Sequence, residues 1–151
     1  MTPLIKNTLL LITLFFTQSL YAAQSVTFLN PEKPAAVNLP FSEAVRVGNT
    51  FYLSGQLGVS PGTMTLVSGG MEAEAKQTME NIKATLESHN LSMSNIVKCT
   101  VMIADISQWG IFNKIYVTYF EDNYPARSAF GANGLALGAQ VEVECIAVYP
   151  Q

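Results

Sequence analysis

The C-terminal run Val141–Val148 constrains the fold of this chain more than any other segment. Its odd positions, continued by Tyr149, are apolar, and this period of two is typical of a β-strand that buries one face. The even face begins with Glu142 and Glu144 and then becomes apolar. Because an isolated carboxylate is costly in a dry site, these acids are expected at a solvated strand end, beside a cation, or in a pocket.

A permanent cation precedes this strand in the segment Pro125-Ala126-Arg127-Ser128. The planar fork of Arg127 can hold a carboxylate through two charge-assisted hydrogen bonds, which suits it to anchor a small acid. The same side chain could instead form a structural salt bridge with Glu142 or Glu144. The residues alone leave both interpretations open.

Residues 1–23 have the plan of a secretory signal peptide. Lys6 precedes a strongly apolar stretch at 8–20, and Ala22-Ala23 supplies small residues for cleavage. The stretch is shorter than the roughly 20 residues of a membrane span, although an uncleaved anchor is the alternative. We expect cleavage near Ala22 or Ala23, export to the periplasm or the medium, and no stable membrane anchor afterwards.

Residues 24–151 are then expected to form a single compact domain. The whole chain carries 8 Lys and Arg against 11 Asp and Glu, a formal net charge of −3. Nucleic-acid binding relies on a clustered excess of basic side chains, so this balance disfavours a nucleic-acid partner.

The pattern along the domain predicts an α+β fold with a mixed sheet and both helices on one face. Gly48-Asn49 tolerates the positive φ of a tight hairpin, and Ser107 is the expected N-cap of the second helix. The expected order is a hairpin at 41–47 and 50–56, a helix at 71–89, a strand at 95–103, a helix at 107–122, and strands at 127–132 and 141–148. The second sheet face needs cover, which self-association would provide.

Four segments, taken in order, resemble the RidA/YjgF/UK114 family across most of the chain. They are Tyr52–Gln56, Asn81–Val101, Pro125–Ser128 and Val141–Val148. The resemblance implies a chorismate-mutase-like fold and a homotrimer with sites between subunits. It also implies hydrolysis of reactive enamine and 2-imino acids to 2-keto acids and ammonia, without a cofactor.

The same resemblance implies roles for particular residues. Arg127 would bind the substrate carboxylate, and Glu142 would be the catalytic acid that holds the attacking water and relays a proton to ammonia. Ser54 and Gly55 match a Ser-Gly-Gln segment that positions substrate or water. Asn113 matches an asparagine that helps to line the pocket, and its alternative is a solvated helical residue.

Two positions depart from the family pattern. Phe41 follows Pro40 where many members have tyrosine, so a hydroxyl at the pocket mouth is missing, while the ring could still form a wall of the substrate site. Ala129 stands where many members have cysteine, which removes thiol chemistry at that position. Hydrolysis is not expected to depend on that thiol.

The cysteine and histidine content argues against a metal site, because His89 is the only histidine and Cys99 and Cys145 form no cluster with it in the sequence. Both cysteines fall in predicted strands, the usual environment of buried free thiols. A disulfide is the alternative if the two strands are adjacent, since an oxidising compartment permits one.

Two classes of function fit these residues. The first is a cofactor-independent deaminase of 2-imino acids, and the second is a non-enzymatic trimeric protein that binds small carboxylates or acts as a chaperone. The presence of both Arg127 and Glu142 favours the deaminase. Export complicates it, because the pyridoxal-phosphate chemistry that generates such imines is cytoplasmic, and another exported enzyme would have to supply the substrate.

Overall fold

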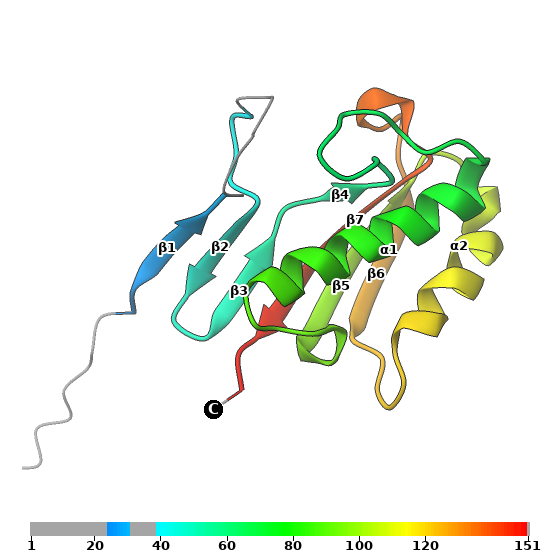
Figure 1. Cartoon of the computed structure of the whole chain (residues 1–151). Coiled ribbons are helices and arrows are strands. Elements are labelled where there is room, and N and C mark those ends of the chain that lie inside the picture. Colours follow the sequence, from blue (N-terminus) through cyan, green and yellow to red (C-terminus); the bar gives the residue numbers. More distant parts are fainter. Residues whose placement is uncertain (1–23, 31–38, 151) are drawn as a thin grey trace, which may run out of the picture.

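The computed structural model describes residues 24–30 and 39–150, and the predicted signal peptide lies outside them. The described chain forms one mixed sheet with two α-helices on one face (Figure 1). These helices are α1 (Gly70–Ser88) and α2 (Trp109–Tyr116). The predicted α+β class is confirmed. Within the described ranges, no helix combines the length and apolar character needed to cross a bilayer.

The sheet contains seven strands in the described part of the chain, in the order β1-β2-β3-β7-β5-β6, with β4 also paired to β7. Only β5 and β6 run parallel. The predicted final strand therefore lies at the centre of the sheet. The strands are β1 (Val26–Leu29), β2 (Ala44–Val47), β3 (Thr50–Leu53), β4 (Gln56–Leu57), β5 (Ile96–Ile103), β6 (Ala126–Gly131) and β7 (Val141–Val148). Short 3-10 helices lie at Met93–Asn95, Ile106–Gln108, Val117–Tyr119 and Ala136–Gly138.

The predicted hairpin is confirmed, with Gly48 at a φ of 57° in the turn between β2 and β3. The sequence did not predict β1, which extends the sheet by pairing with β2. The run expected as one strand at 50–56 is interrupted at Ser54-Gly55. Tyr52 pairs with Ile146 of β7, and Gln56 pairs with Val143. Four residues along this strand therefore lie opposite three along β7, and the one extra residue forms a bulge. Such a bulge changes the direction of nearby side chains.

The core lies between the sheet and α1, as the helical spacing predicts. Ala75, Met79, Ile82 and Leu86 of α1 are fully buried. They pack against the odd-numbered face of β7, whose buried residues are Val141, Val143, Cys145 and Ala147. The even-numbered face of β7 points away from both helices, and it carries Glu142 and Glu144.

The second helical segment is shorter and less regular than the predicted range 107–122, because 3-10 turns flank α2 on both sides. Ser107 is not the cap of this segment. The carboxylate of Asp105 instead accepts a hydrogen bond from the Ser107 N–H at 3.0 Å, so the first turn begins earlier in the chain. A side-chain acceptor ahead of the first turn satisfies an N–H that has no helical partner.

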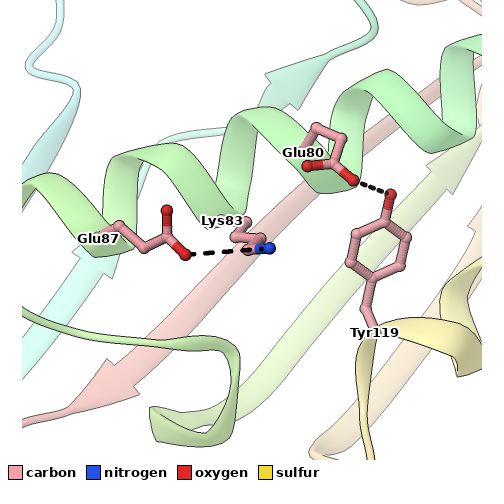
Figure 2. A network of polar contacts seen from close by, with 4 residues as sticks. All are labelled: Glu80, Lys83, Glu87 and Tyr119. Carbon is pink, nitrogen blue, oxygen red and sulfur yellow. Dashed lines mark hydrogen bonds and ion pairs between the residues drawn. The ribbon is translucent and has the colours of Figure 1, made fainter.

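A polar contact ties the segment after α2 to α1 (Figure 2). The Tyr119 hydroxyl donates to Oε1 of Glu80 at 2.8 Å. Burial, and then the Glu80 partner, raise the pKa of Tyr119. Lys83 and Glu87 form an exposed ion pair at 4.0 Å on α1, which contributes little to stability. The Tyr119 contact holds the 3-10 turn that follows α2 against α1.

The expectation that Cys99 and Cys145 are free thiols is wrong, because the two residues form a disulfide. They occupy directly opposite positions of the antiparallel β5–β7 pair. Both side chains are buried on the helix-facing side of the sheet. The sequence could not show this pairing, since it depends on which strands are neighbours and in which register.

Among residues 24–30 and 39–150, no helix covers the sheet face opposite α1 and α2 (Figure 1). Tyr52 of β3 and Phe130 of β6 are 45% and 49% exposed on that face. Ile146 is the register partner of Tyr52 and is only partly buried. An exposed apolar sheet face of this kind is typical of a protein–protein interface.

Candidate functional site

Arg127 lies in β6 opposite Cys99, and its side chain therefore points toward the helices. Its guanidinium carbon is 4.5 Å from the ring centroid of Trp109 and 4.3 Å from that of Tyr116. Nη2 donates to Oδ1 of Asn113 at 2.8 Å. Two aromatic faces and a hydrogen bond thus hold the cation in one orientation. All three contacts come from α2.

The other terminal nitrogen of this guanidinium, Nη1, is buried and has no hydrogen-bond partner among the described residues. Arg127 lines a pocket of about 370 Å³ together with residues of α2 and of the segment that precedes β6. These residues are Asn113, Tyr116, Val117, Tyr124 and Pro125. Because buried polar groups are nearly always satisfied, an oriented cation with an unused donor is suited to receive an anion.

Glu142 lies on the opposite face of the sheet, in register with Met102 of β5 and Leu57 of β4. Its carboxylate lies against Gly55, where a Cβ atom would collide with Oε1. Glycine at position 55 therefore permits this close approach. Burial, and then the negative charge of Glu144, raise the pKa of Glu142 above its usual value. A raised pKa suits a carboxyl group that must both take and return a proton near neutral pH.

Ser54 lies in the irregular segment between β3 and β4, next to Gly55. Its hydroxyl donates to the Ser42 carbonyl at 2.7 Å, and its N–H donates to the Glu43 carbonyl at 3.0 Å. These two bonds anchor the bulge to the chain just before β2. The adjacent Phe41 is 55% exposed, so its ring is available on the surface.

The predicted site residues therefore form two clusters within one chain. Asn113 is brought to Arg127, and Gly55 is brought to Glu142. Arg127 and Glu142 themselves lie on opposite faces of the sheet, and their partners on β5 are three residues apart, or about 10 Å along the strand. The alternative of a structural salt bridge between them is wrong for the single chain, since Lys83–Glu87 is the only ion pair among the described residues.

Sequence reasoning missed Trp109 and Tyr116 as contacts of Arg127. Trp109, Asn113 and Tyr116 follow one another at spacings of four and three, so they share one helix face. Because Asn113 was already a candidate site residue, this spacing could have identified Trp109 and Tyr116 as its neighbours. The described residues hold no group of three or more His, Cys, Asp or Glu side chains that could bind a metal.

The fold and these two clusters define a small α+β domain with an oriented arginine on one face of its sheet and a partly buried glutamate on the other. The model of the endoribonuclease L-PSP family matches residues 31–149, and the chain belongs to this family. The expected family relationship is thereby confirmed.

Named relatives and solved structures specify the relationship further. The chain is 44% identical over 115 residues to the mouse 2-iminobutanoate/2-iminopropanoate deaminase. The aligned region covers 76% of this chain and 84% of the mouse protein. The human protein of the same name is 42% identical over 115 residues, with 76% and 83% covered. The crystal structure of RidA from an Antarctic Psychrobacter matches with a TM-score of 0.74 at 39% identity, covering 82% of this chain and 99% of that one.

Proposed function

We propose that this protein is a cofactor-independent hydrolytic deaminase that converts reactive 2-imino and enamine acids to 2-keto acids and ammonia. The observation that carries the proposal is the oriented Arg127, which lines a pocket and has an unused Nη1 donor. The identity of 44% to a mouse protein named for this activity supports it. The family description refers to a ribonuclease, but a net charge of −3 does not favour an RNA substrate.

In the proposed reaction, Arg127 binds the carboxylate of the imine and fixes the C=N bond relative to Glu142. Glu142 takes a proton from water as the water oxygen bonds to the imine carbon, and it passes this proton to the imine nitrogen. The resulting amino alcohol then collapses: Glu142 takes the hydroxyl proton as the C=O bond forms, and it gives this proton to the nitrogen as the C–N bond breaks and ammonia leaves. Ser54 and the Gly55 backbone position the water or the substrate in this scheme.

We propose that a homotrimer completes the site. Arg127 and Asn113 of one subunit would then meet Glu142, Ser54 and Gly55 of the next, with Phe41 as a wall. The separation of the two clusters onto opposite sheet faces supports this arrangement, because neither cluster contains both the anchor and the base. The uncovered sheet face supplies apolar surface for the contact.

The deaminase proposal predicts that the purified protein accelerates release of keto acid and ammonia from freshly generated 2-iminobutanoate or 2-iminopropanoate. The measurement compares initial rates with and without protein against the spontaneous hydrolysis of each imine. Binding of 2-oxobutanoate without any acceleration would instead favour the alternative of a non-enzymatic carboxylate-binding protein.

We also propose that residues 1–23 are a signal peptide and that the mature domain functions in the periplasm or the medium. The Cys99–Cys145 disulfide supports export, since such bonds persist mainly in oxidising compartments. Mass spectrometry of the native protein should find Ala23 or Gln24 at the N-terminus and the two cysteine peptides linked. A soluble cytoplasmic pool that retains Met1 would contradict export.

A further inference from the structure

We propose that the Tyr116 hydroxyl is a second donor to the substrate carboxylate, acting beside Arg127. This inference rests on the proposed function and assigns a binding residue to the same pocket. Tyr116 lies on the buried face of α2 with Phe112, and packing alone would account for an apolar ring at its position. Its hydroxyl requires a separate explanation.

The hydroxyl of Tyr116 has no hydrogen-bond partner among the described residues, although the residue is only 2% exposed. A buried hydroxyl without a partner loses its bonds to water and gains none in return, so native proteins rarely leave one in that state. Tyr116 and Arg127 line the same pocket, and Nη1 of Arg127 also lacks a partner. Two residues that line this pocket therefore each carry a buried polar group without a hydrogen-bond partner.

The two groups match the two oxygens of a carboxylate. An arginine N–H can only donate, and a tyrosine O–H can donate as well, so both groups can bond to the acceptor oxygens of one carboxylate. Burial raises the pKa of Tyr116 to about 12, while the charge of Arg127 and then its close approach to the phenol oxygen act in the opposite direction. The phenol therefore keeps its proton at neutral pH and is available as a neutral donor.

The ring of Tyr116 is held independently of its hydroxyl. Its centroid lies 5.6 Å from that of Phe112 and 4.8 Å from that of Phe120, and the Arg127 guanidinium stacks on it. The substitution Tyr116→Phe removes one oxygen and retains this packing. Tyr119→Phe is a matched control, because Tyr119 is in the same segment, its hydroxyl already donates to Glu80, and it does not line the pocket.

The experiment measures Kd by calorimetry for 2-oxobutanoate and for its neutral amide, 2-oxobutanamide. In Tyr116→Phe we expect the affinity for the keto acid to fall about tenfold or more, since hydrogen bonds to charged groups are the strong ones. The affinity for the amide should change less than twofold, and Tyr119→Phe should bind both ligands like the parent. With 2-iminobutanoate, KM should rise in parallel while kcat stays within about twofold.

Equal weakening of keto acid and amide in Tyr116→Phe would overturn the proposal, as would parental affinity for the keto acid. A purely structural hydroxyl would instead lower the Tm of the ligand-free variant, whereas removal of an unpartnered hydroxyl should leave it unchanged or raise it. Failure of the parent to bind 2-oxobutanoate at millimolar concentration would also overturn it. Binding by the parent without turnover would refute only the deaminase proposal, because the Kd comparison needs no catalysis.

Discussion

Arg127→Ala is expected to reduce kcat/KM for 2-iminobutanoate by tens- to several-hundredfold. The reason is the loss of a charge-assisted contact in a water-poor pocket, which costs about 2–4 kcal/mol. The guanidinium is already oriented by Trp109, Tyr116 and Asn113, so it pays little ordering cost when the carboxylate arrives. Steady-state assays of keto-acid release measure the loss.

Arg127→Lys is the matched variant for this prediction, and it should recover little activity. A lysine keeps the charge but lacks the planar fork that bonds Asn113 and stacks between two rings. Both variants should retain the oligomeric mass and a Tm close to the parent's. If Arg127→Ala is as active as the parent, the carboxylate role is wrong; if it is inactive because the oligomer dissociates, Arg127 has a structural role instead.

Much of the fold follows from local patterns in the sequence. The period of two in Val141–Val148 predicts a strand with one buried face, and β7 has that burial pattern. The helical spacing that includes Ala75, Met79, Ile82 and Leu86 predicts the face of α1 that packs on the sheet. These elements are predictable because a single buried face imposes its own periodicity on the sequence.

Features that depend on contacts between distant elements could not be predicted in this way. The disulfide requires Cys99 and Cys145 to face each other, which is fixed by the register of β5 against β7. The bulge at Ser54-Gly55 is visible only when the register of both flanking strands on β7 is known. A run of β-prone residues gives no information on either register.

The candidate site shows the same division. The sequence singled out Arg127 and Glu142 through the family resemblance, but it could not show that they lie on opposite faces of the sheet in one chain. Arg127 pairs with Cys99 of β5, and Glu142 pairs with Met102. These two partners are three residues apart, and residues an odd number apart on a strand point to opposite faces of the sheet. The role proposed for Tyr116 likewise depends on a burial and a missing hydrogen bond that only the structure reveals.

Glu142→Gln is expected to retain keto-acid binding but to lose turnover by at least about a hundredfold, because an amide cannot accept the proton of the attacking water. The pH profile gives a second readout. The pKa of Glu142 is raised by burial and then by Glu144, so the catalytic carboxylate is lost as pH falls through that raised value. Glu144→Gln removes the negative charge that helps to raise the pKa of Glu142. The pH at which kcat falls on the acidic side should therefore be lower in this variant than in the parent.

Co-expression of Arg127→Ala with Glu142→Gln decides whether the two clusters work across subunits. In randomly mixed trimers, about one quarter of the sites would join an intact Arg127 to an intact Glu142 from the next subunit. Activity should therefore return to about a quarter of the parent's per chain, far above the residual activity of either variant alone. Light scattering should give three chain masses for the mixed sample. Mixed trimers that remain inactive would place both residues in a site within one chain, and a monomeric parent would exclude a shared site altogether.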